Sequence, residues 1–188
     1  MPRLPLQTLE SAPEASVPYV QRSQSANGYL PNLIASLANA PTALETYLTV
    51  SEINSRSGLS LAERETIQIT AAGIHGCTYC VAGHTAIALK KARLEPELVD
   101  SIREQQPLSD PRLEAVANLT RAVIATRGAV SDDALAAFRA AGFNDANVLE
   151  VVLGVSLATL CNFANNLAQN ELNPELAAYR WAPQANAA

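Results

Sequence analysis

The sequence predicts an all-α protein, built as a multi-helix bundle. Hydrophobic residues make up 48% of the 188-residue chain but aromatic residues only 5%, so the core must consist mainly of Ala, Leu, Val and Ile. This composition favours close-packed helices over a sheet, which is usually richer in aromatic and β-branched residues. No segment alternates apolar and polar residues with a period of two, whereas helix start and stop signals recur along the chain.

The chain is expected to form one domain preceded by a short arm. Residues 1–17 carry three prolines and no helical periodicity, which predicts an extended N-terminal arm. Residues 18–188 are expected to form a single helical domain, with its core at about residues 41–123.

Proline, capping residues and glycine mark where the helices of that domain begin and end. In the first half, a proline opens one helix and a Ser-x-x-Glu capping box starts the next. In the second half, an Asp-Pro pair, a Ser-Asp-Asp run and an Asn-Asp pair open further helices. The expected helices run from Pro41 to Gly58, Leu61 (after the Ser60–Glu63 capping box) to His75, Cys77 to Lys91, Pro96 onward, Pro111 to Gly128, Ser131 to Gly142, and Asn144 or Asp145 to Ala168.

The last of these helices, ANVLEVVLGVSLATLCNFANNLA, is apolar nearly all round. We therefore expect it to be central or buried between subunits, which favours a homo-oligomer. Its most apolar part, Val151 to Cys161, is too short for a membrane span. Near the C-terminus, Trp181 is expected to anchor the chain end onto the helical body or a neighbouring subunit.

Charge and the N-terminal sequence restrict the possible partners and compartment. The net charge is −5 with no basic stripe, so neither nucleic acid nor an anionic membrane is an expected partner. The N-terminus has no apolar run of the signal-peptide kind, which predicts a cytoplasmic protein. In that compartment, a close pair of cysteines indicates metal binding or catalysis more than a structural disulfide.

The stretch GCTYCVAGH concentrates most of the reactive side chains of the chain. With 3.6 residues per turn, Cys80 and His84 lie roughly 60° and 20° from Cys77, so all three share one helix face. Cys77 comes directly after Gly76, where free backbone N–H groups and the helix dipole favour a thiolate. Helix geometry alone therefore predicts that Cys77 is the more acidic thiol.

The preceding helix adds a carboxylate to this face. Glu65 interrupts an apolar stripe formed by Leu61, Ile69 and Ala72, whereas Glu63 is used by the capping box. A buried carboxylate is costly unless it is paired. If the two helices form a hairpin bent at Gly76, Glu65 approaches the cysteine–histidine face and the three side-chain types form a proton relay.

The spacing of Glu65, eleven further residues and then CTYCVAGH resembles the active-site signature of the alkylhydroperoxidase D proteins, within the carboxymuconolactone decarboxylase superfamily. The resemblance implies an all-helical trimer or hexamer that reduces hydroperoxides, uses an external dithiol reductant and needs no cofactor or metal. By position, Cys80 would be the peroxidatic cysteine, Cys77 the resolving cysteine, His84 a proton relay and Glu65 the proton acceptor. Tyr79 departs from the pattern, because the best-known members have a histidine there.

Other interpretations of these residues stay open at this point. The cysteine pair could serve a disulfide reductase or redox relay that does not use peroxide. It could instead belong to a non-catalytic scaffold, as buried packing or bound to zinc with His75 or His84. Cys161 is interpreted as a core residue, and His75 and Tyr79 as lesser candidates for the site. Three amides near the end of the long helix are expected to cap or pair locally, with contact to the site as the alternative for one of them: Asn162, Asn165 and Asn166.

Overall fold

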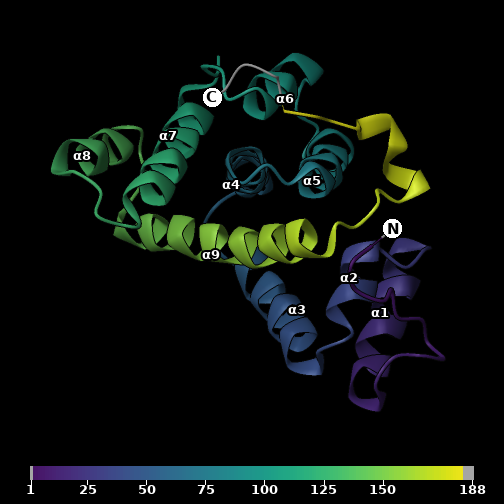
Figure 1. Cartoon of the computed structure of the whole chain (residues 1–188). Coiled ribbons are helices and arrows are strands. Elements are labelled where there is room, and N and C mark those ends of the chain that lie inside the picture. Colours follow the sequence, from purple (N-terminus) through teal and green to yellow (C-terminus); the bar gives the residue numbers. More distant parts are fainter. Residues whose placement is uncertain (1, 184–188) are drawn as a thin grey trace.

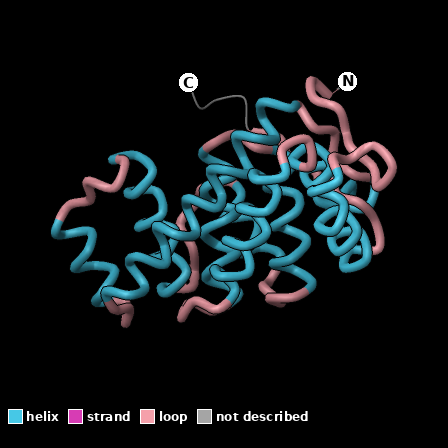
Figure 2. Tube along the Cα trace, turned by 90° about the horizontal axis from the view of Figure 1, so that it is seen from below, coloured by secondary structure: helices cyan, strands magenta, loops and turns pink. Residues whose placement is uncertain are grey.

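The computed structural model describes residues 2–183, which contain only helices and loops (Figure 2). Helices account for 69% of the structure, and the all-α prediction is confirmed. The α-helices are α1 (Val17–Asn27), α2 (Asn32–Leu37), α3 (Pro41–Ser55), α4 (Leu61–Ile74), α5 (Thr78–Lys90), α6 (Pro96–Arg103), α7 (Pro111–Thr126), α8 (Asp132–Ala140) and α9 (Asp145–Ala168); the short 3-10 helices are η1 (Glu14–Ser16) and η2 (Pro174–Tyr179).

The helix hairpin α4–α5 lies at the centre of the fold. Figure 1 shows α4 end-on, with α5 and α7 on either side and α9 running across all three. The predicted capping box is present: the Ser60 side chain accepts the Glu63 N–H, and the Glu63 carboxylate accepts the Ser60 N–H. Glu63 also accepts two hydrogen bonds from Arg112, at 2.8 and 3.0 Å, which ties α4 to the start of α7.

Helix α9 crosses α4 at very close range. A Cβ added to Gly154 would lie 3.0 Å from Ile67 Cγ2, so only glycine allows this approach without a shift. The Gln68 side chain of α4 donates to the Gly154 carbonyl at 2.9 Å and fixes the same crossing.

The apolar character of α9 is only partly explained by burial within one chain. One face packs against α2, α3, α4, α5 and α7. The opposite face exposes large apolar side chains, namely Leu149, Val152, Phe163 and Leu167. The apolar run from Val151 to Cys161 was expected to be too short to cross a membrane, but it belongs to a helix of 24 residues that is long and apolar enough to do so by length and composition, so that expectation is wrong. Its contacts with five other helices show that α9 packs as a helix of the bundle.

The N-terminal residues lie along the helical body. Residues 2–13 contain no helix, and they are held by backbone bonds from Arg3 N to Ala168 O (2.7 Å) and from Gln7 N to Ala35 O (3.1 Å). Helices α1 and α2, which the sequence signals did not delimit, follow directly and pack near α3 and α9 (Figure 1).

The C-terminal segment returns over α5 after α9 ends. Its helix η2 packs on α5, and the Asn173 side chain accepts hydrogen bonds from the Asn32 N–H (2.9 Å) and the Tyr79 hydroxyl (2.7 Å). Trp181 is buried and donates to the Glu104 carboxylate at 2.9 Å, so it anchors the chain end onto the helical body as expected.

Candidate active site

The turn between α4 and α5 determines where the cysteines lie. Gly76 adopts φ +66°, a left-handed conformation that glycine accepts at no steric cost, and the Cys77 N–H closes the turn onto the Ala72 carbonyl at 2.9 Å. Cys77 is therefore the N-cap of α5 and not its first helical residue as expected. Its sulfur accepts the Cys80 N–H at 3.4 Å, which is how an N-cap side chain satisfies a free donor.

The two thiols are buried and hydrogen-bonded to each other. Cys77 is 1% exposed and Cys80 is 4% exposed. A hydrogen bond from the Cys80 thiol lowers the pKa of Cys77, although burial opposes that shift. The same bond, with burial and the negative charge on Cys77, raises the pKa of Cys80 well above its ordinary value. The first proton therefore leaves Cys77, as the helix-terminus argument predicts.

Glu65 and His84 form a short ion pair between α4 and α5. Glu65 Oε2 lies 2.7 Å from His84 Nδ1, and the side chains are 8% and 23% exposed. Burial favours the neutral ring, but the charge of Glu65 and its hydrogen bond outweigh burial, so the pKa of His84 is raised. Because Nδ1 is bound to Glu65, the other ring nitrogen, Nε2, is free to act on a ligand.

The hairpin thus brings Glu65 and His84 together, but it does not link the ring to the sulfurs. Within residues 2–183, His84 makes no hydrogen bond to Cys77 or Cys80; its effect on Cys77 is through its charge. The Cys80 sulfur instead accepts a hydrogen bond from Asn165 Nδ2 on α9, at 3.2 Å.

Asn165 is one of the three amides for which the sequence left contact with the site as the alternative to local capping, and it belongs to a chain of side-chain hydrogen bonds. Its Oδ1 accepts from Asn170 Nδ2 at 2.6 Å, and Asn170 Oδ1 accepts from the Ser36 hydroxyl at 2.6 Å. The chain fixes which end of the Asn165 amide faces the sulfur. The available signal was a polar residue one turn after Cys161 on the buried face of an apolar helix.

The Tyr79 hydroxyl is held by two hydrogen bonds, and these fix the position of the side chain. Its hydroxyl donates to Asn173 Oδ1 and accepts from the Leu33 N–H at 3.5 Å. Burial raises the pKa of Tyr79 well above its ordinary value, so the hydroxyl stays protonated and carries no proton for the thiols.

His75 and the neighbouring amides lie beside the site. His75 Nδ1 lies 3.0 Å from Asn162 Oδ1, and its ring packs edge-on against Phe163 with 5.0 Å between ring centroids. Asn166 donates to the His75 carbonyl at 2.8 Å, so it caps the end of α4. His75 is hence part of the contact between α4 and α9, and its ring makes no contact with the thiols in the described part of the chain.

The expectation that Cys161 is only a core residue is incomplete. Cys161 is buried as expected, but it hydrogen-bonds with Tyr47 and lines the same cavity as Cys80. Burial raises the pKa of Cys161 to about 12, so this thiol stays protonated at neutral pH.

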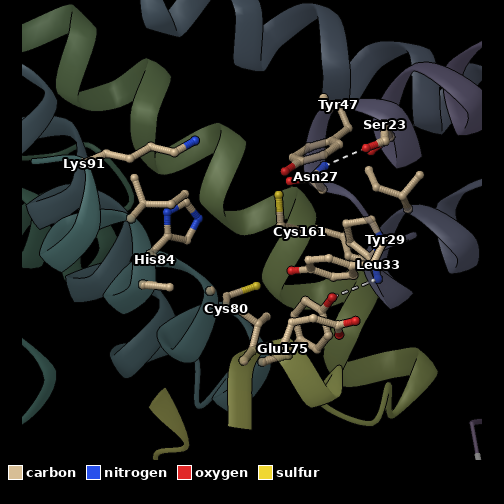
Figure 3. A pocket seen from close by; sticks show the side chains of 18 of the residues that line it. Ser23, Asn27, Tyr29, Leu33, Tyr47, Cys80, His84, Lys91, Cys161 and Glu175 are labelled. Atoms are coloured by element: carbon tan, nitrogen blue, oxygen red, sulfur yellow. Dashed lines mark hydrogen bonds between the residues drawn. The ribbon is translucent and has the colours of Figure 1, made fainter. Parts of the chain in front are cut away.

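A cavity of about 600 Å³ opens onto Cys80 and His84 (Figure 3). Its wall is largely aromatic and aliphatic, with Lys90, Lys91 and Glu175 as its charged residues. The sulfur of Cys80 and the His84 ring both face this space, and the aromatic lining is formed by Tyr29, Tyr47 and Tyr79. A separate cleft of about 290 Å³ opens onto Cys77.

No group of three or more His, Cys, Asp or Glu side chains that could hold a metal ion occurs between residues 2 and 183. The zinc interpretation needs such a group, since structural zinc sites use four protein ligands. The geometry instead presents Cys80 and His84 on one cavity, with Cys77, Glu65 and Asn165 in contact with them from behind its wall. These groups are suited to sulfur redox chemistry.

Comparison with known proteins agrees with the all-helical fold. Residues 38–122 match the model of the carboxymuconolactone decarboxylase family. An uncharacterized peroxidase-related protein with an alkylhydroperoxidase AhpD core, from Ralstonia eutropha JMP134, has the same fold. It superposes with a TM-score of 0.86 at 22% identity over 96% of this chain and 97% of that one. Residues 38–122 thus resemble the carboxymuconolactone decarboxylase family, and the chain as a whole has the AhpD-like fold.

Two further solved structures share the AhpD-like fold. The peroxidase-related protein from Silicibacter sp. TM1040 superposes with a TM-score of 0.79 at 21% identity, over 95% of this chain and 94% of that one. The debrominase Bmp8, a variant of which was solved with 2,3,4-tribromopyrrole, superposes with a TM-score of 0.77 at 14% identity over 94% of each chain. No protein of curated function matches the sequence.

Proposed function

We propose that this AhpD-like protein is a thiol-dependent peroxidase, which reduces hydroperoxides through the Cys77–Cys80 pair in antioxidant defence. The observation that carries the proposal is the cavity of about 600 Å³, onto which both the Cys80 sulfur and the His84 ring open. A hydroperoxide bound there meets a nucleophile and an acid at once. The peroxidase-related names of two structural neighbours support the same class of reaction.

In the first step, the Cys80 sulfur attacks the terminal peroxide oxygen and the O–O bond breaks. The thiol proton of Cys80 passes along the existing hydrogen bond to the Cys77 thiolate. The departing alkoxide takes a proton from His84 Nε2 and leaves as the alcohol, while Cys80 becomes a sulfenic acid. His84 therefore acts on the substrate as an acid, and the immediate base for Cys80 is Cys77; Glu65 holds the imidazolium.

In the second step, the Cys77 sulfur attacks the Cys80 sulfur and the S–O bond breaks. The hydroxide leaves as water with the Cys77 proton, so one disulfide, one alcohol and one water account for all atoms. An external dithiol then reduces the disulfide and returns its two protons, one to Cys80 and one to the Glu65-bound His84.

Debromination is a second candidate for the same site. The neighbour Bmp8 is a debrominase, and the wall of the Cys80 cavity is aromatic enough to hold a flat ring. Replacing a carbon–halogen bond with a carbon–hydrogen bond needs two electrons, which one dithiol supplies on becoming a disulfide. A redox relay that never meets peroxide remains the third use of the pair.

A mass-spectrometric thiol count tests these alternatives. Reduced wild type, Cys80→Ser and Cys77→Ser are each treated with one equivalent of cumene hydroperoxide or 2,3,4-tribromopyrrole, with Cys161→Ser as the matched control. The peroxidase proposal expects a Cys77–Cys80 disulfide from hydroperoxide in wild type and in the control, and a sulfenic acid on Cys80 in the Cys77→Ser variant.

Each other result selects a different function. A disulfide formed only with the bromopyrrole, together with released bromide, would replace the peroxidase by a dehalogenase. A sulfenic acid on Cys77 would reverse the roles of the two cysteines. If the thiols stay reduced with both compounds, the two remaining interpretations of the cysteine pair are a redox relay that does not use peroxide and a structural pair.

A further inference from the structure

The two sulfurs of the dithiol open onto different sides of the protein. Cys80 lines the cavity of about 600 Å³ and Cys77 does not, whereas Cys77 lines the cleft of about 290 Å³ and Cys80 does not. The cleft is lined, besides Cys77, by Thr78, Tyr79, Asn165, Asn166, Gln169 and Asn170.

Tyr79 is the wall between the two spaces. It lines both the cavity and the cleft, and it follows Cys77 and precedes Cys80 in the chain. The side chain is buried, and its hydroxyl is fixed by Asn173 at 2.7 Å, so the partition is held from the C-terminal segment. A molecule that enters by one side therefore meets only one of the sulfurs.

We propose that the reductant enters by the amide-lined cleft and attacks Cys77, while the hydroperoxide enters by the aromatic cavity and is attacked by Cys80. This inference rests on the dithiol cycle proposed above. The attacking thiolate forms a mixed disulfide with Cys77, the Cys77–Cys80 bond breaks, and the Cys80 sulfur leaves with the electron pair. The second thiol of the reductant then displaces Cys77, so the reductant leaves as its own disulfide and both cysteines are reduced.

The electrostatics of the mixed disulfide permit Cys80 to leave. In the reduced protein, the main factor opposing a Cys80 thiolate is its role as donor to Cys77, and the charge of Cys77 adds to it. Neither acts once Cys77 is bonded to the reductant. What remains against the thiolate is burial and the neighbouring Cys161, opposed by a hydrogen bond from Asn162 and by the Asn165 N–H at 3.2 Å, which stabilise a departing thiolate.

The lining of the cleft indicates the class of reductant. All seven lining residues are uncharged, and four are amides that can hydrogen-bond a polar ligand. Cys77 is only 1% exposed at the base of this small space, so the broad surface of a folded protein cannot reach its sulfur. The reductant that fits is therefore a small, uncharged dithiol.

A matched pair of tryptophan substitutions tests the two entrances. Thr78 is exposed and lines the cleft, whereas Ala26 is exposed and lines the cavity. Thr78→Trp should slow reduction of the disulfide by dithiothreitol about tenfold or more and leave oxidation by cumene hydroperoxide within about twofold; Ala26→Trp should do the reverse. The starting disulfide is made with diamide, so the reduction rates can be measured even if the wild-type protein does not react with hydroperoxide. That lack of reaction would contradict the peroxidase proposal and not the entry route of the reductant.

Other results would overturn the inference. If Ala26→Trp slowed the reductant while Thr78→Trp did not, both reactants would share the aromatic cavity. A second readout needs no variant: wild-type disulfide is quenched in acid during reduction by 2-mercaptoethanol, and peptide mapping should locate the mixed disulfide on Cys77. An adduct on Cys80 would contradict the proposal, as would equal reduction rates with dithiothreitol and the dianionic dimercaptosuccinate at matched thiolate concentration.

Discussion

Replacing Glu65 with Gln tests how the ion pair controls the acid of the site. The substitution keeps the shape and a hydrogen-bonding group opposite His84 Nδ1, at a distance of 2.7 Å, but removes the charge that raises the pKa of His84. At pH 8 fewer molecules then carry the imidazolium. We expect oxidation by cumene hydroperoxide to slow about 10- to 100-fold, at the low end for an acid–base group because the ring itself remains.

The same substitution has a stability effect with a defined pH dependence. A hydrogen bond to a charged group is worth about 1.5–3 kcal/mol, and the 23% exposure of the His84 side chain places this one near the lower figure. Because the folded-state pKa of His84 is raised, the stabilisation is complete below the ordinary value of 6.5 and is lost as the pH rises through the folded-state value. Urea unfolding should therefore show a difference of about 1.5–2 kcal/mol at pH 6 that shrinks by pH 9.

Glu63→Gln is the matched control, since Glu63 is also a buried carboxylate on α4. It binds Arg112 and the Ser60 N–H, away from the thiols, so its loss should lower stability without moving the pH–rate profile. The rate is followed by stopped-flow consumption of hydroperoxide from pH 5 to 9. An unchanged profile in the Glu65 variant, or the same shift in the control, would refute the role given to the ion pair.

Three further substitutions address other parts of the site. Asn165→Ala removes the N–H donor to the Cys80 sulfur and should slow sulfenic acid formation about tenfold; an unchanged single-turnover rate would show that this hydrogen bond is not used. Tyr79→Phe removes a buried hydroxyl and should cost about 1 kcal/mol in urea unfolding while leaving that rate intact, whereas a large loss of rate at normal stability would assign the hydroxyl to the chemistry. The exposed apolar face of α9 supports the homo-oligomer that the sequence predicts, so Phe163→Lys combined with Leu167→Lys should lower the mass measured by light scattering; an unchanged oligomer would place the interface elsewhere, and a monomeric wild type would contradict the prediction.

The contact that the sequence predicted and the structure shows lies within one hairpin. The turn at Gly76 folds Glu65 back onto His84, whereas Cys77, predicted to share a helix face with Cys80 and His84, is the N-cap of α5 and opens onto a separate cleft. The acidity of Cys77 also follows from local features, because its position at the start of α5 is set by the glycine before it.

Contacts between segments that are distant in the sequence could not be predicted from helical periodicity and local spacing. Asn165 meets Cys80 across 85 positions of sequence, and Tyr79 meets Asn173 across 94. Helical periodicity shows which face of α9 is buried but not which helix covers it, so Cys161 was recognised as buried without its neighbour being known. The short helix α2 was missed because six residues are too few for a periodic signal.

The close crossing at Gly154 fixes the position of α9 against α4 at one point. Asn165 lies eleven residues further along the helix, about 16 Å from that crossing at 1.5 Å per residue. A side chain at position 154 would force a shift of a few tenths of an ångström, either of the Ile67 side chain on α4 or of α9 itself. A shift of α9 would move the Asn165 amide that donates to the Cys80 sulfur. We therefore expect side-chain volume at a position that touches neither sulfur to change the reactivity of the dithiol, and a screen restricted to the cavity walls would overlook it.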